Sequence, residues 1–179
     1  MKDRIARAYP HRAGAHCIAE HTTSRRIFDS PAVGKCVCRT GKQDSDLDFE
    51  IKNRSGRTYY TLAVDGCLYL SDGPRRCDCA VFWDDTIVFI EFKLGMPVGK
   101  RRKLSERIRE AVKQLVPTIE RFVQHQIILD TTTVEAVAFV SRHHTRPAHT
   151  IAIQNAIDKI RTAIPAVKVR FKVTKSRTV

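Results

Sequence analysis

The sequence places two carboxylates and an amine, those of Asp78, Glu91 and Lys93, in two neighbouring apolar runs. Glu91 and Lys93 are two positions apart in an apolar, strand-like run, so a β-strand places both side chains on the same face. Asp78 lies in the strand-like run that precedes it. Two carboxylates and an amine in such surroundings could bind a divalent cation and stabilise the negative charge that develops during phosphodiester hydrolysis.

The register of a β-hairpin decides whether Asp78 reaches Glu91. Two runs rich in Val, Ile and Phe, 77–83 and 86–93, flank the Asp-Asp dipeptide at 84–85 and predict such a hairpin. A two-residue turn places Asp78 directly opposite Glu91, with the two Cβ atoms about 5 Å apart. A four-residue loop gives the same pairing, whereas a three-residue loop shifts the register by one position.

Two opposed carboxylates repel each other unless a cation lies between them. Oxygen ligands suit Mg²⁺ or Mn²⁺, with water and substrate phosphate completing the shell, and the backbone carbonyl of Phe92 is a further candidate ligand. Lys93 would face the phosphate, where we favour orientation of water and stabilisation of negative charge over a role as general base. The alternative from the residues alone is a surface aspartate beside an ordinary cross-strand ion pair, because Glu-x-Lys is a short pattern.

The segment after the hairpin predicts an amphipathic helix. Apolar residues from Leu104 to Phe122 recur at steps of three and four, and Pro117 should bend or interrupt the helix in its second half. Gln114 and Arg107 share a polar stripe of this helix. Four cations open the helix: Lys100, Arg101, Arg102 and Lys103. With Arg107 they could hold a DNA backbone beside the metal, or they could form a solubilising loop.

The other expected elements complete a fold of mixed helices and strands. They are a helix over 12–28, strands over 47–52, 58–64 and 67–70 that would form a meander, a strand over 134–140, a helix over 151–164 and a strand over 167–173. This order predicts an α/β or α+β fold around a mixed sheet.

Asp78, the hairpin, the run 90–95 (IEFKLG) and a basic helix bearing Gln114 together resemble the PD-(D/E)XK nuclease superfamily, over about residues 65–140. Cys77 stands where the family name has proline. The resemblance implies a restriction-endonuclease-like core with a central mixed sheet flanked by helices. It also implies that Asp78 and Glu91 hold the metal while Lys93 assists the attack of water. Many members add an acidic residue from the first helix, for which Glu20 is the nearest candidate.

The resemblance further implies one nuclease domain over 1–179, with its core at about 58–141. Such a domain would cut DNA with little sequence preference, act as a homodimer, or be guided by a separate targeting subunit, as in bacterial defence or mobile-element systems. A non-catalytic nucleic-acid-binding module and an RNA-cleaving enzyme stay open as alternatives. Aromatic residues, 7% of the chain, lie mostly in strand-like runs and offer no evident platform for unstacked bases. Asp65, before Gly66, is most simply a turn residue, although it could approach the active-site face.

Composition agrees with a nucleic acid as partner. The chain has 179 residues, with 32 Lys and Arg against 19 Asp and Glu, which gives a formal net charge of +13. Such a charge attracts polyanions, because neutralising phosphates releases condensed counterions. No apolar run is long enough to span a membrane and no apolar leader opens the chain, so we expect no membrane contact and a cytoplasmic location.

Six cysteines are expected to be thiols or metal ligands, because disulfides are rare in that compartment: Cys17, Cys36, Cys38, Cys67, Cys77 and Cys79. The Cys36-x-Cys38 and Cys77-x-Cys79 pairs each predict two sulfurs on one strand face. A zinc site would require the two pairs to meet, and we favour core packing instead.

Overall fold

The computed structural model describes residues 1–11, 16–40, 47–69, 75–94, 101–140 and 150–179. Within these ranges the elements, in chain order, are α1 (Lys2–Ala8), β1 (Ile18–His21), β2 (Arg25–Ser30), β3 (Lys35–Arg39), β4 (Phe49–Lys52), β5 (Tyr59–Ala63), β6 (Cys79–Trp83), β7 (Thr86–Phe92), α2 (Arg101–Gln124), β8 (Thr133–Phe139), α3 (Thr150–Ala163), β9 (Val169–Val173) and β10 (Ser176–Thr178).

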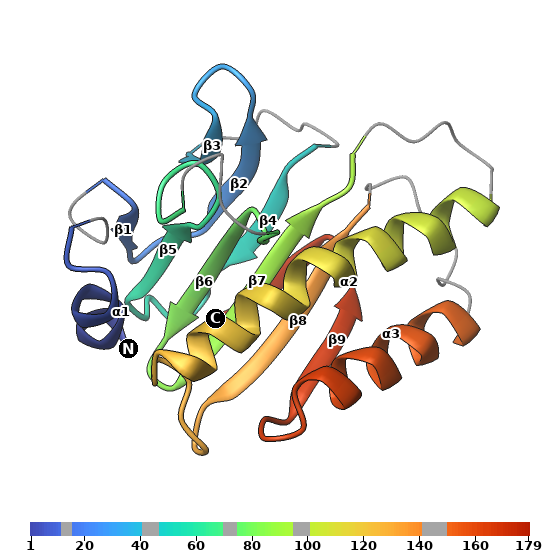
Figure 1. Ribbon diagram of the computed structural model, residues 1–179. Coiled ribbons are helices and arrows are strands. Elements are labelled where there is room, and N and C mark those ends of the chain that lie inside the picture. The colour runs from blue at the N-terminus through green and yellow to red at the C-terminus, as the bar shows by residue number, and fades with distance from the viewer. Residues whose placement is uncertain (12–15, 41–46, 70–74, 95–100, 141–149) are drawn as a thin grey trace.

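A six-stranded mixed sheet forms the centre of the fold, in the order β1-β5-β6-β7-β8-β9. Neighbouring strands are antiparallel from β1 to β7, whereas β7, β8 and β9 run parallel. Helices α2 and α3 pack side by side on one face of this sheet (Figure 1). The expected mixed sheet flanked by helices is therefore confirmed.

The hairpin that carries Asp78 and Glu91 has the predicted register. Trp83 pairs with Thr86 and Cys79 pairs with Ile90, so the residues at 84 and 85 form a two-residue turn. Asp84 adopts a φ of +44°, a conformation that aspartate tolerates better than most side chains. One further step along the same register brings Asp78 opposite Glu91.

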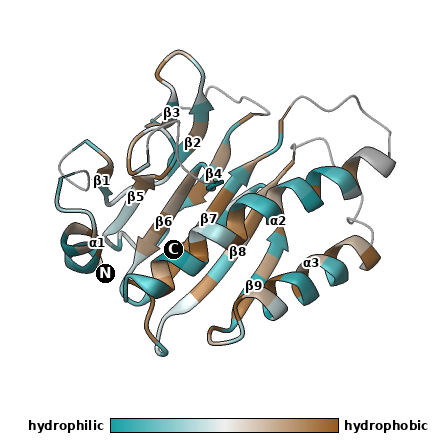
Figure 2. Ribbon diagram, in the orientation of Figure 1, coloured by the Kyte–Doolittle hydropathy of each residue, from teal (hydrophilic) through white to brown (hydrophobic). Residues whose placement is uncertain are grey.

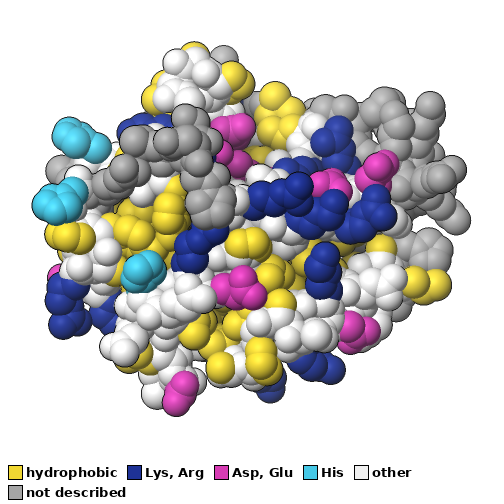
Figure 3. All heavy atoms as spheres, in the orientation of Figure 1, with side chains coloured by type: hydrophobic (Ala, Val, Ile, Leu, Met, Phe, Trp, Pro, Cys, Tyr) yellow, Lys and Arg dark blue, Asp and Glu magenta, His cyan; other side chains and the backbone are white. Residues whose placement is uncertain are grey.

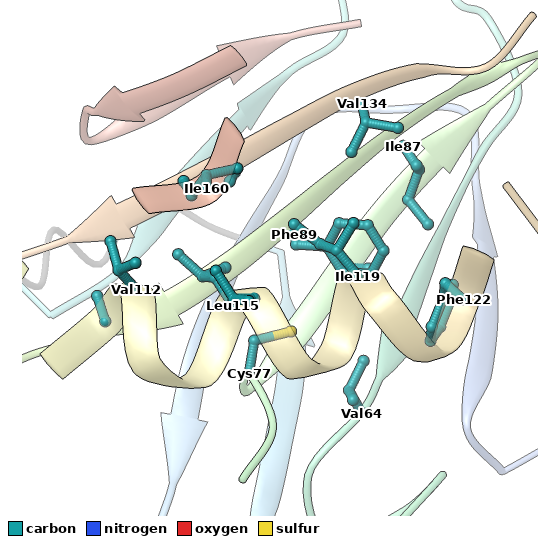
Figure 4. Close-up of a cluster of buried hydrophobic side chains, with 14 of the residues drawn as sticks. Val64, Cys77, Ile87, Phe89, Val112, Leu115, Ile119, Phe122, Val134 and Ile160 are labelled. Atoms are coloured by element: carbon teal, nitrogen blue, oxygen red, sulfur yellow. The ribbon is translucent and has the colours of Figure 1, made fainter. Parts of the chain in front are cut away.

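Helix α2 supplies most of the core on the helix-covered face. Its apolar residues meet the sheet in a cluster in which Phe122 packs edge to face on Phe89, with ring centroids 5.0 Å apart (Figure 4). Figure 2 shows the matching pattern: the central strands are largely hydrophobic, whereas α2 alternates between hydrophobic and hydrophilic residues. The helix continues through Pro117, so the expected interruption is wrong.

A second sheet, in the order β10-β4-β2-β3, covers the other face of the central sheet. Phe49, Ile51 and Ile27 of this sheet pack against residues such as Val81 and Phe139 of the central one. The alternating run at 47–52 predicts that β4 forms a meander with β5. That expectation is wrong, because β4 pairs with β2 and β10 instead.

An ion-pair cluster joins the two sheets at the C-terminal end of the chain. Glu135 of β8 is fully buried and lies 3.1 Å from the Nζ of Lys172 on β9. Arg177 of β10 approaches the same carboxylate to 3.0 Å and lies over the ring of Trp83. The last strand of the small sheet is thus tied to the large sheet by charge as well as by apolar packing.

The N-terminal part of the chain differs from the expectation. The helix predicted over 12–28 is wrong, because β1 and β2 occupy most of this range and the helix lies earlier, at Lys2–Ala8. β1 pairs with β5, and the buried side chain of His21, its last residue, bonds to Thr61 Oγ1 of that strand at 3.0 Å.

The strand expected over 67–70 is also wrong in its described part, since residues 64–68 form a turn. Gly66 adopts a φ of +68°, and a Cβ at this position would lie 1.9 Å from the carbonyl oxygen of Gly34. The close approach of these two backbones requires glycine. Cys67, the next residue, forms a disulfide with Cys17, which contradicts the expectation that all six cysteines are thiols.

No helix within the described ranges is both long and apolar enough to cross a membrane.

Candidate active site

Asp78 lies directly before β6, at the edge of the central sheet where β7 ends. Its Oδ2 accepts a hydrogen bond of 2.6 Å from the backbone N–H of Phe92. Its own carbonyl oxygen accepts from the N–H of Val64, at 3.0 Å. Asp78 is therefore held from two sides, by the strand that carries Glu91 and by the end of β5.

Glu91 is buried on β7, with only 1% of its surface exposed. Its Oε1 accepts a hydrogen bond from the Nζ of Lys93, the residue two positions along the chain. Its Oε2 has no hydrogen-bond partner among the described residues. A buried carboxylate oxygen without a donor is costly, and a bound cation is one way to compensate it.

Gln114 connects this pair to helix α2. Its Oε1 accepts a hydrogen bond from Lys93 Nζ, and its Nε2 donates to the backbone carbonyl of Arg76 at 3.2 Å. The amide thus fixes both the ammonium group and the chain that leads into Asp78. The four residues Asp78, Glu91, Lys93 and Gln114, which the sequence analysis singled out, lie together in the structure.

The surroundings disfavour the charged form of both carboxyl groups. Burial raises the pKa of Asp78 to about 6, although the hydrogen bond from Phe92 opposes this change. Burial also raises the pKa of Glu91 well above its ordinary value, and the neighbouring Asp78 charge raises it further. A cation placed between them would reverse these effects, since nearby positive charge favours the carboxylate form.

The donor set fits a hard divalent cation that is bound through few protein ligands. Asp78 and Glu91 offer carboxylate oxygens, and Mg²⁺ commonly binds through one or two carboxylates while keeping several waters. Across the described part of the chain, no three His, Cys, Asp or Glu side chains form a ready-made metal cluster. The Phe92 ring packs on Phe139 in the core below, at 5.3 Å between centroids, and its carbonyl stays a predicted ligand.

Asp29 is a residue of this region that the sequence analysis missed. It lies on β2 of the second sheet. The negative charge of Asp29 raises the pKa of Asp78, and the positive charge of Lys93 lowers the pKa of Asp29. Asp29 is exposed, but partial desolvation by its neighbours raises its pKa, and the charge of the nearby Asp65 raises it further. The segment was expected to be helical, and its residues RRIFDS show no alternation that would have indicated a strand.

Asp65 lies in the turn after β5, where its backbone N–H donates to the carbonyl of Asp78 at 3.2 Å. Its Oδ1 lies 2.6 Å from the Nε of Arg76, whose backbone carbonyl accepts from Gln114. Glu20, in contrast, does not join the site. It lies on the edge strand β1 with its side chain 55% exposed, 3.8 Å from Lys2, because the segment forms a strand and not the expected helix.

The predicted basic residues are placed only in part. Lys100 lies outside the described residues, and of Arg101, Arg102 and Lys103 only the helical backbone is described. Arg107 is half-buried on α2, two turns before Gln114 and on the same side of the helix. Figure 3 shows Lys and Arg side chains gathered along α2 and over the carboxyl end of β7.

The paired cysteines serve the core. The expectation that Cys77 and Cys79 share one strand face is wrong, because Cys77 precedes the strand and packs under α2, whereas Cys79 faces the second sheet. Burial raises the pKa of both thiols well above its ordinary value. Cys36 meets Cys79, while Cys38 contacts Thr61 Oγ1 at 3.3 Å, so the two pairs do not converge on one point.

Comparison with known proteins returned no match, whether to a protein-family model, to a curated protein or to a solved structure. The resemblance to the PD-(D/E)XK superfamily stays a prediction that rests on the residues quoted for it.

Proposed function

We propose that this chain is a divalent-metal-dependent nuclease that hydrolyses phosphodiester bonds of DNA. The observation that carries the proposal is the buried pair Asp78 and Glu91 beside Lys93, with one Glu91 oxygen that has no partner among the described residues. The hairpin register brings the two carboxyl groups together, and burial raises the pKa of both. Perturbed titratable groups of this kind cluster at functional sites.

Each residue has a distinct role in this proposal. Asp78 and Glu91 would hold Mg²⁺ or Mn²⁺, which when bound polarises the phosphate and lowers the pKa of a water molecule. Lys93 would orient the attacking water and stabilise the negative charge that develops on the phosphate. Gln114, which bonds to Lys93 and to the Arg76 carbonyl, is a positioning residue.

The basic surface would supply affinity for the DNA backbone, through Arg107 and the 100–103 run. Specificity for particular DNA sequences would come from a homodimer or from a separate targeting subunit. The cytoplasmic location belongs to the proposal too. The Cys17–Cys67 disulfide weighs against it, since disulfides are rare in reducing compartments.

The test is cleavage of supercoiled plasmid and single-stranded DNA in Mg²⁺, Mn²⁺ or EDTA. We expect metal-dependent cutting that falls by at least about 100-fold in Asp78→Asn and Lys93→Ala, because each removes a group that acts on the reacting phosphate. Glu20→Gln and Lys52→Ala are matched controls of the same charge change, and both should cut like the wild type. They lie on β1 and β4, away from the site.

Two outcomes would contradict the proposal. Binding of DNA without cutting, equal in the wild type and in Lys93→Ala, would favour the non-catalytic binding module. Cutting of RNA but not of DNA would favour the RNA-cleaving enzyme.

A further inference from the structure

A cluster of aromatic and cationic side chains lies beside the candidate active site. Tyr9 follows α1, Tyr69 ends the turn after β5, and His125 follows α2. The tyrosine hydroxyls bond to each other, with ring centroids 5.5 Å apart, and the Tyr9 ring lies 5.2 Å from that of His125. We call these residues, together with Arg121, the aromatic patch.

Arg121 completes the aromatic patch. Its guanidinium group lies over the Tyr69 ring, 5.3 Å from the centroid, and also donates a hydrogen bond of 3.3 Å to the backbone carbonyl of Arg75. Both tyrosines and Arg121 are only partly buried, and His125 is exposed. Figure 3 shows hydrophobic, cationic and histidine side chains together between α1 and the C-terminal half of α2. The patch therefore offers aromatic and guanidinium groups at the surface.

The aromatic patch and the candidate active site share one side of α2. Gln114 and Arg121 are seven residues apart, which is two helical turns and about 10 Å along the axis. Their side chains donate to the carbonyls of two consecutive residues, Arg76 and Arg75. A distance of about 10 Å corresponds to about three stacked nucleotides at 3.4 Å each.

On the basis of the proposed function, we propose that the aromatic patch binds unpaired bases of the substrate strand, about three nucleotides from the phosphate that is cut. The favoured substrate is then single-stranded DNA or a duplex with an unpaired end. Paired bases are stacked on one another and cannot reach an aromatic side chain. Unpaired bases stack readily on tyrosine, histidine and arginine planes, independently of their sequence.

The test measures binding of fluorescein-labelled 20-nucleotide DNA in EDTA, so that catalysis does not enter. We expect single strands to bind more tightly than a blunt duplex of the same sequence. Tyr69→Leu and His125→Ala should each weaken binding of single strands by about tenfold, since loss of one stacked base has about that cost. Affinity for the duplex should be unchanged. Tyr69→Phe, which keeps the ring, should bind like the wild type.

Tyr60 provides a matched control. It lies on β5 with the Lys2 ammonium over its ring at 5.1 Å, so it has the same pairing of aromatic ring and cation at another place. Tyr60→Leu should leave single-strand binding unchanged. His125→Ala changes an exposed side chain, so its effect does not depend on the fold tolerating Tyr69→Leu.

The outcomes separate this inference from the proposed function. Equal affinity for single strands and duplex, or equal weakening of both in the patch variants, overturns the aromatic patch even if the protein cuts DNA. Selective loss of single-strand binding in Tyr69→Leu and His125→Ala supports it even if no cutting is found with Mg²⁺.

Discussion

Asp78 and Glu91 are residues whose charged forms the folded chain disfavours. Burial raises the pKa of both carboxyl groups, with the charge of Asp29 adding to the effect at Asp78 and the charge of Asp78 adding to it at Glu91, and Lys93 compensates only part of this effect. An arrangement selected for stability alone would place apolar side chains here, as on the rest of β7. Functional sites often contain groups that reduce the stability of the fold. The two buried carboxyl groups are therefore candidates for a functional role.

This raised pKa predicts how stability depends on pH. The pKa of Asp78 rises from 3.8 to about 6 on folding. Between these values the folded protein holds a proton that the unfolded chain has lost, so stability falls as pH rises through this window. Asp78→Asn should therefore be more stable than the wild type above pH 6, by on the order of 3 kcal/mol, and should match it below about pH 4.

Urea unfolding in EDTA at several pH values measures this difference. Asp130→Asn, an exposed change in the loop before β8, is the control and should show no such trend. At subsaturating metal the proposed nuclease activity should rise with pH, because the cation must displace protons from both carboxyl groups, and saturating metal should shift this rise to lower pH. A wild type that is more stable than Asp78→Asn at pH 8 would mean that the carboxylate is held by favourable partners.

At the scale of elements, local patterns explain what the sequence could predict. The hairpin register follows from a two-residue turn between two apolar runs rich in Val, Ile and Phe, and α2 follows from a 3.6-residue apolar period. Both patterns lie within one continuous segment and can be recognised without knowing which distant segments pair with it. The strands β1 and β2 were missed because they are short and their pairing partners, such as β5 for β1, lie far along the chain.

Thr118 shows how one helix positions the site. Its buried hydroxyl donates to the carbonyl of Gln114 at 2.9 Å and accepts from the N–H of Cys77 at 2.8 Å. We expect Thr118→Val to lower the free energy of unfolding by about 1–3 kcal/mol, because it leaves the buried Cys77 N–H without an acceptor. Nuclease activity should fall as well, since Cys77 precedes Asp78 and Gln114 contacts Lys93.

Denaturant unfolding and plasmid cleavage measure the two effects of this change. Thr118→Ser keeps the hydroxyl and is the matched control, which should retain the activity. If Thr118→Val and Thr118→Ser behave alike, the hydroxyl does not join α2 to the strand.

At the scale of the molecule, the candidate site draws on three layers. Gln114 comes from the helical layer, Asp78 and Glu91 from the central sheet, and Asp29 from the second sheet. The second sheet could not be predicted from local patterns, because it combines strands from near both ends of the chain, with β10 paired to β4. Asp29 was therefore out of reach of the sequence analysis, whereas Asp78, Glu91 and Lys93 were not.

The disulfide between Cys17 and Cys67 also joins distant segments, since it closes a loop across a sequence separation of 50. The sequence did not predict it, because reduced cysteines were expected from a cytoplasmic location. The short distance between Cys17 and Cys67 becomes apparent only in the folded chain. Closing such a loop restricts the unfolded chain, so reduction should lower the free energy of unfolding by about 2–4 kcal/mol. Urea unfolding with and without reductant measures this change, and a Cys17→Ser, Cys67→Ser double variant should not respond to reductant.

A thiol count on the denatured protein checks the same prediction independently. Without reductant we expect four reactive thiols, from Cys36, Cys38, Cys77 and Cys79, and six after reduction. Six thiols in protein purified without reductant would mean that Cys17 and Cys67 stay reduced, as the cytoplasmic expectation requires. The turn at 64–69 would then be held against β1 only by hydrogen bonds and packing. Because Asp65 of this turn binds Arg76, reduction should also loosen the chain that leads into Asp78.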